Sequence, residues 1–274
     1  MPTPRDALRN LVPFKPVACR VLQLLAQNNP EIKEITELIE SDPALSSEVL
    51  IVANSPLIGT RADVKTVNHA VTMMGLERTK SITATAAMRA FVRNGPRSPV
   101  MRSCWLHSVA CALISSEIAH LFGVTRDQAY IAGLLHDIGR VGLLTAYPDK
   151  YSATALGDYL TVPEILEAER KRLGMDHCAA GELLTTGWNF PAVLATAAAG
   201  HHGAKEQENA TLAVVRCGCL LADTLRFEVI RYQQVPEFEE IRQGLPGGSH
   251  PPFAFRPEDL EEKVIHSVYS LDGM

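Results

Sequence analysis

Residues 127–137, DQAYIAGLLHD, constrain the fold of this chain more than any other stretch. The segment is apolar on nearly every face, and a helix of this kind belongs in the centre of a protein. It nevertheless ends in two adjacent polar residues, His136 and Asp137. An unpaired buried carboxylate is strongly unfavourable, so Asp137 must meet a cation or strong hydrogen-bond donors in the interior.

The rest of the chain is also patterned for helices. Residues 31–40, EIKEITELIE, place apolar side chains at three- and four-residue spacing, and similar stripes recur in most later segments. Residues suited to begin or end these helices are Asp42, Thr66, Gly75, the Thr161 and Glu164 capping box, and Gly174. No alternating strand pattern stands out, and no internal repeat. We therefore predict an all-α fold, a two-lobed helical bundle.

A Gly- and Pro-rich break at residues 94–100, NGPRSPV, is expected to separate two helical parts. The first is an N-terminal helical subdomain over residues 11–97, and the second a helical core over 98–230. Residues 231–274 form a C-terminal extension. Its final amphipathic helix is marked by Leu260, Val264, Val268 and Leu271.

Composition narrows the class of protein. A net charge of −5 gives no support for nucleic-acid binding, and 46% apolar with 21% charged residues is ordinary for a globular protein. The longest apolar runs fall short of the roughly 18 residues that span a bilayer, and the N-terminal residues do not read as a secretory signal. Six scattered cysteines without a CxxC pair suggest reduced thiols. We expect a cytoplasmic protein that does not contact a membrane.

Several histidines and acids stand where the helical pattern calls for apolar groups. They are His107, His136, Asp137, His177, His201, His202 and Asp223. Imidazole nitrogens and carboxylate oxygens suit Fe, Mn, Zn, Co or Ni without distinguishing among them, so a divalent metal ion would satisfy these groups together. Neighbouring residues on a helix point about 100° apart. The His136–Asp137 pair can therefore share an ion only where the helix ends, and Gly139 is expected to supply that turn.

Simpler interpretations stay open for each residue. A single histidine beside an apolar stripe is more often a hydrogen-bonded core residue than a ligand. Asp223 alone could pair with Arg216 or Arg226, and the cysteines are expected to be small core residues. The metal hypothesis depends on the co-occurrence of seven such groups in one half of the chain.

A second feature is electrostatic. Residues 78–116 contain no Asp or Glu, yet six basic residues lie between Arg78 and Arg102. This segment could attract a phosphate-bearing ligand or dock an acidic partner, or it could be no more than a solvated face. Interleaved aromatic residues are missing, which argues against stacking on nucleic-acid bases.

With these residues in view, the chain resembles the HDOD proteins, a helical output domain of bacterial signalling related to the HD superfamily. The likeness runs from about Leu11 to about Phe227. It is carried by ELIESDPALSSEVLIVANSP, VNHAVTMMGLERTKSI, WLHSVACA, LLHDIGR, MDHCAAGELLTTGWNFP and AAAGHHG. This resemblance implies an HD-superfamily core in the C-terminal half and a regulatory role.

The resemblance also implies a ligand set. In the HD superfamily the pattern H…HD…D holds a metal ion, which corresponds here to His107, His136, Asp137 and Asp223. The group with the GYP signature adds histidines for a second ion, similar to His177, His201 and His202. That signature itself is missing, which argues against cyclic di-GMP cleavage. Arg140 stands where the usual residue is Lys, so a phosphate contact there would be forked.

Two functions follow as expectations. The first is an HDOD-type signal-transduction or regulatory protein that contacts a signalling protein partner and has a metal-binding HD site. The alternative is a metal-dependent phosphohydrolase acting on a nucleotide or phosphodiester. In that alternative Asp137 and His177 serve in catalysis, and Arg140 or residues 78–102 hold phosphate. The nature of the site must decide between them, since a fold does not fix a function.

Overall fold

The computed structural model confirms the all-α prediction. It describes residues 3–11, 14–25, 31–55, 58, 63–203, 209–246, 258, 259, 261, 262 and 264–266, and no strand occurs in these ranges. The first five helices are α1 (Pro4–Arg9), α2 (Pro16–Leu25), α3 (Ile32–Glu40), α4 (Pro43–Ala53) and α5 (Val67–Arg93). The next six elements are α6 (Pro99–Ile118), η1 (Ala119–Phe122), α7 (Arg126–Leu135), α8 (Ile138–Ala146), α9 (Pro148–Ala155) and α10 (Val162–Leu173). The last are α11 (His177–Gly187), α12 (Ala192–Gly200), α13 (Ala210–Thr224) and α14 (Phe238–Gln243).

Most of the predicted helix boundaries are confirmed. Asp42 caps α4 by accepting from the backbone N–H groups of the next turn, and Thr66 caps α5 in the same way. Gly75 has φ of 75° and kinks α5 rather than ending it, while Gly174 ends α10 in the left-handed conformation. The predicted capping box is wrong in detail. The Thr161 side chain makes no capping bond, and the Glu164 carboxylate accepts from the backbone of Leu160 at 2.9 Å.

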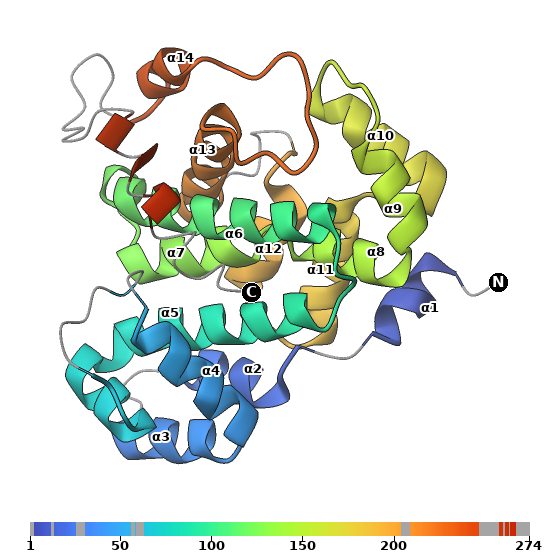
Figure 1. The fold of residues 1–274 in the computed structure, drawn as a ribbon. Coiled ribbons are helices and arrows are strands. Elements are labelled where there is room, and N and C mark those ends of the chain that lie inside the picture. Colours follow the sequence, from blue (N-terminus) through green and yellow to red (C-terminus); the bar gives the residue numbers. More distant parts are fainter. Residues whose placement is uncertain are drawn as a thin grey trace.

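Helix α7 lies at the centre, as its apolar sequence predicts. All seven residues from Ala129 to Leu135 are buried. The helix packs against α5, α6, α12 and α13. Figure 1 shows α5, α6 and α7 crossing the middle of the molecule. Helices α2, α3 and α4 lie on the side of α5 that faces away from α6 and α7.

The predicted seam at residues 94–100 corresponds to the turn between α5 and α6, where Ser98 caps α6. A single hydrophobic core nevertheless extends across it, from Leu8 to Val264. The turn at residue 97 therefore does not interrupt this core cluster, and the domain boundaries stay a prediction. Val264 of the predicted last helix is buried, whereas Leu260, Val268 and Leu271 lie outside the described residues.

One helical stretch, Pro99–Phe122, is long and apolar enough to cross a membrane by length and composition, contrary to the expectation from sequence. An 18-residue window of this stretch has a mean hydropathy of 1.2, and 67% of that window is buried inside the protein. Its apolar surface is therefore used mostly to build the core around α7.

Candidate metal centre

The end of α7 places the His136–Asp137 pair in the interior. α7 stops at Leu135 and α8 begins at Ile138, so the two residues occupy the junction between two helices. Gly139 has a different role from the predicted turn. A Cβ atom at this position would lie 1.9 Å from the carbonyl oxygen of His177, so the glycine lets α8 approach the start of α11.

The predicted residues converge on this junction from other helices. His107 comes from α6, His177 begins α11, Asp223 lies in the last turn of α13, and His201–His202 directly follow α12. All of these side chains are buried except that of His202, which is half-buried. The convergence expected from the sequence is therefore present, although the elements are separated by up to about a hundred residues.

On one side of Asp137, two histidines face each other. Nε2 of His107 lies 3.2 Å from Nε2 of His136. Their other ring nitrogens contact backbone carbonyls, Nδ1 of His136 at 2.6 Å from Gly133 O and Nδ1 of His107 at 3.0 Å from Phe227 O. A donor N–H on Nδ1 leaves a lone pair on each Nε2, which is the arrangement of metal-binding histidines. Burial also holds the pKa of His136 well below its ordinary value, so this imidazole is neutral.

On the other side of Asp137, two more histidines face its Oδ1 atom. Nε2 of His201 lies 3.3 Å and Nε2 of His177 lies 3.5 Å from Oδ1. Nδ1 of His201 contacts the Ala198 carbonyl at 3.0 Å, and Nδ1 of His177 contacts the Glu169 carboxylate at 2.6 Å. Ligand atoms of His177, His201 and His202 lie within 4.8 Å of one another, as do those of His136, Asp137 and His201.

These distances fit divalent metal ions. Two ligands about 2.1 Å from a tetrahedral ion lie about 3.4 Å apart, close to the 3.2 and 3.3 Å separations of the nitrogen and oxygen pairs. Asp137 Oδ1 and His177 Nε2 are fully buried and have no hydrogen-bond partner among the described residues. Buried polar atoms are rarely left so, and a shared cation would satisfy both. Asp137 lies between the two groups of histidines.

Arg140 does not occupy the position expected of a phosphate ligand. It is buried, and its Nε donates to Asp137 Oδ2 at 2.8 Å. Its Nη1 lies 3.1 Å from the Tyr151 hydroxyl and 3.2 Å from Glu169 Oε1. Burial alone would raise the pKa of Asp137, but Arg140 and the neighbouring histidines hold it well below its usual range. Arg140 is therefore committed to internal carboxylates and neutralises the centre of the cluster.

Asp223 also departs from the predicted ligand set. Its Oδ1 atom faces Nδ1 of His107 at 3.5 Å, on the opposite side of that ring from Nε2. Its Oδ2 atom accepts from the Tyr232 hydroxyl at 2.9 Å, and burial raises its pKa. In this arrangement Asp223 can orient the His107 ring, and its role as a metal ligand stays a prediction.

A cysteine takes the place expected for Asp223. Cys219 Sγ lies 3.6 Å from His107 Nε2, and ligand atoms of His107, His136 and Cys219 lie within 4.8 Å of one another. From the sequence, Cys219 is expected to be a small core residue. A signal was present, because Cys219 precedes Asp223 by four residues and so lies on the same face of α13.

Little space is left beside the cluster. The cavity bounded by His107, Asp137, Cys219 and Asp223 has a volume of only about 10 Å³. Val229, Ile230 and Tyr232 cover it. This covering segment, residues 227–236, is fixed by backbone bonds from Gln233 to Tyr159 (3.0 Å) and from Gln234 to Leu160 (2.9 Å). We call it the strap.

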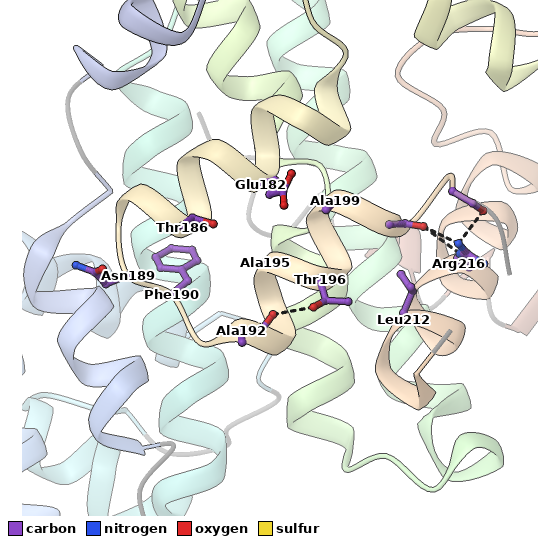
Figure 2. A pocket seen from close by; sticks show the side chains of 12 residues that line it. Glu182, Thr186, Asn189, Phe190, Ala192, Ala195, Thr196, Ala199, Leu212 and Arg216 are labelled. Atoms are coloured by element: carbon purple, nitrogen blue, oxygen red, sulfur yellow. Dashed lines mark hydrogen bonds between the residues drawn. The ribbon is translucent and has the colours of Figure 1, made fainter. Parts of the chain in front are cut away.

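A larger pocket, of about 790 Å³, lies between α11, α12 and α13 (Figure 2). Glu182, Phe190 and Leu212 contribute to its walls, and Arg216 donates hydrogen bonds to the carbonyls of Gly200 and Gly203 at its edge. The candidate ligands are not part of its lining. The pocket is therefore separate from the histidine cluster.

Comparisons with known proteins identify the family and the fold. The family model of the HDOD domain matches residues 11–204. An HDOD domain protein of unknown function from Geobacter sulfurreducens superposes with a TM-score of 0.78 at 21% identity, covering 98% of this chain and 97% of its own. A provisionally assigned phosphohydrolase from Shewanella amazonensis gives a TM-score of 0.71 at 20% identity, with coverage of 97% and 95%.

Two further matches come from longer proteins. A provisionally assigned signal transduction protein from Marinobacter aquaeolei superposes with a TM-score of 0.71 at 15% identity, covering 99% of this chain and 62% of its own. An uncharacterized protein of Treponema pallidum is 23% identical over 222 residues, which are 77% of this chain and 42% of that protein. The chain thus spans less than half the length of that curated relative. The solved structures share the fold, and the match to the family model over residues 11–204 shows that the chain belongs to the HDOD domain family.

Proposed function

We propose that this chain is a regulatory protein of bacterial signal transduction whose HD-type site binds metal but does not turn over substrate. The observation that carries the proposal is the small volume, about 10 Å³, of the cavity at the histidine cluster. A volume of about 10–15 Å³ accommodates one water molecule. An ion or a water fits such a space, whereas a phosphate ester does not.

The donor atoms indicate which residues would hold an ion. Nε2 atoms of His107 and His136 with the thiol of Cys219 offer one set, and His177, His201 and His202 with Asp137 offer another. A soft thiol beside imidazoles suits Zn, Co or Fe better than Mn. A divalent ion bound there would lower the pKa of a coordinated water molecule to about 7. In this proposal that chemistry is unused and the ion stabilises the packing of α6, α7, α11 and α13.

Regulation would then depend on the outer surface of the bundle and on a signalling protein partner. The name of one structural relative, a provisionally assigned signal transduction protein, supports this role. A cytoplasmic location suits it, because the six cysteines form no disulfide in the described part of the chain.

The alternative is a metal-dependent phosphohydrolase acting on a nucleotide or phosphodiester. The phosphohydrolase name of a structural relative and the full set of histidines favour it. In this alternative Asp137 and His177 act next to the reacting phosphate, and the strap must move away before substrate enters. Arg140 can contribute only after giving up part of its bonds to Asp137 and Glu169.

The discriminating experiment measures phosphodiester hydrolysis by the metal-loaded wild type, by Tyr232→Ala with a loosened strap, and by Asp137→Asn. Bis(p-nitrophenyl) phosphate and a set of nucleotides serve as substrates. We expect no difference in rate between wild type and Asp137→Asn. Wild-type hydrolysis that disappears in Asp137→Asn contradicts the proposal. Hydrolysis confined to Tyr232→Ala, and abolished by adding Asp137→Asn, shows a catalytic site that the strap gates.

A further inference from the structure

Four arginines line a cavity of about 760 Å³ at the turn between α5 and α6. Arg89 and Arg93 come from the end of α5, Arg97 from the turn, and Arg102 from the first turns of α6. The remaining wall is largely apolar and includes Val92, Pro96, Met101 and Trp105. The seven candidate metal ligands are not among its lining residues, so this arginine cavity is a separate site.

The charges around the cavity are only partly compensated. Glu48 pairs with two of the guanidinium groups, that of Arg89 and that of Arg93, the latter at 3.0 Å. Arg97 is exposed and forms no ion pair within the described part of the chain. One carboxylate thus serves two cations, and a third stands beside them, so the cavity has a positive potential that attracts anions.

Two donor atoms of the lining residues are buried behind the cavity surface and have no acceptor among the described residues. The indole Nε1 of Trp105 and Nε of Arg89 make no hydrogen bond to any described residue, and both side chains are more than nine-tenths buried. Ser98 and Pro99, at the N-terminus of the 20-residue helix α6, line the same cavity. The positive end of that helix dipole adds to the preference for a negative group.

We infer that the arginine cavity binds a small organic phosphate with a planar or apolar part, the chemistry of a nucleotide. Guanidinium groups match phosphate oxygens with paired N–H donors, and the apolar wall fits a ring that a bare anion lacks. The volume lies within the roughly 300–1,000 Å³ of small-molecule pockets. This site would give the proposed regulatory protein a ligand to sense, and it does not depend on metal binding.

The structure also shows which residues of the basic segment, residues 78–102, line the arginine cavity. Lys80 pairs with Glu77 at 2.7 Å, and Arg78 donates to the Ile58 carbonyl at 3.2 Å. These two residues are outside the lining of the arginine cavity. In the basic segment, phosphate binding is therefore assigned to the arginines from Arg89 to Arg102, which line the arginine cavity.

The test is a binding titration with AMP, adenosine and inorganic phosphate as probes. Binding is measured by calorimetry and by tryptophan fluorescence. The chain has two tryptophans, so Trp188→Phe leaves Trp105 as the sole reporter. The test variants are Arg97→Gln, Arg102→Gln and their double variant. Arg20→Gln is the matched control, because Arg20 is an exposed arginine of α2 outside the cavity.

We expect AMP to bind more tightly than adenosine or phosphate and to change Trp105 fluorescence. Loss of one charged contact should weaken AMP about tenfold, while Arg20→Gln leaves binding unchanged. The proposal is overturned if AMP does not bind, if adenosine binds as well as AMP, or if the double variant binds like wild type. It is also overturned if His136→Ala abolishes AMP binding and the double variant does not, since AMP would then occupy the histidine cluster.

Discussion

Arg140 Nε donates to Asp137 Oδ2 at 2.8 Å, so the carboxylate at the centre of the cluster has a protein cation beside it. The same guanidinium reaches Glu169, which accepts from the backbone N–H of His177 at 2.9 Å and contacts its ring. His177 in turn faces the other oxygen of Asp137. These four residues form a closed ring that fixes two ligands on α8 and α11.

Removing the cation of this ring should destabilise the fold strongly. Arg140→Met leaves the carboxylates of Asp137 and Glu169 buried without their partner, which we expect to lower the free energy of unfolding by about 3–5 kcal/mol. Arg140→Lys keeps the charge but loses the paired geometry and should have a smaller effect. Urea unfolding followed by circular dichroism measures both. A change below about 1 kcal/mol in Arg140→Met would show that the ring contributes little.

The close approach of α8 to α11 can be tested at one atom. Gly139→Ala places a Cβ 1.9 Å from the His177 carbonyl, so the helices must separate, and we expect a loss of about 1–3 kcal/mol or more. Gly187→Ala in the same helix pair is the control, because its Cβ would meet nothing within 4 Å. That variant should be neutral or stabilised by up to about 1 kcal/mol. Equal thermal midpoints for the two variants would contradict this account of Gly139.

The strap should control how fast a bound ion leaves. Tyr232→Ala removes the hydroxyl that bonds Asp223 and opens the cover of the cavity. We expect a chelator to extract metal several times faster from this variant than from wild type. Arg231→Ala, whose side chain is 93% exposed next to the same position, should behave like wild type. Identical extraction rates for all three proteins would mean that the strap does not close the site.

Thiol reactivity provides a pH-dependent test of the packing. Burial raises the pKa of Cys19 to about 12, whereas an unfolded cysteine titrates at about 8.5. Near pH 9 the folded protein should therefore keep this thiol protonated and resist alkylation, because only the thiolate reacts. Cys217 is more exposed and should be modified earlier. Mass spectrometry of tryptic peptides reports the order, and early labelling of Cys19 would contradict the described core.

Raising the pH should also weaken the fold through Cys19. A thiol whose pKa is raised on folding keeps its proton while the unfolded thiol loses it, so this residue favours unfolding above about pH 9. Cys19→Ala removes that contribution. Its stability should decline less between about pH 8 and about pH 10 than that of wild type. Equal declines in the two proteins would show that the thiol titrates normally.

The sequence predicts the helices because their apolar stripes are local. It predicts the convergence of the histidines because seven polar groups stand at otherwise apolar positions in one half of the chain and match the ligand pattern of the family that the chain resembles. α7 is recognisable from its apolar faces, and the His136–Asp137 pair must then be satisfied in the interior. The internal pairing of Arg140 could not be predicted, because its partners Tyr151 and Glu169 come from α9 and α10 and no spacing rule connects them. The strap could not be predicted either, since irregular segments with no periodic pattern form it.

The central claim is that the buried histidines hold a divalent ion in a closed site. Elemental analysis of protein purified without chelators tests it most directly, with His136→Ala and Asp137→Ala as matched variants. The account predicts at least one equivalent of a transition metal in the wild type and a marked loss in both variants. A wild type that contains no metal after incubation with Zn, Fe, Mn, Co or Ni would contradict it.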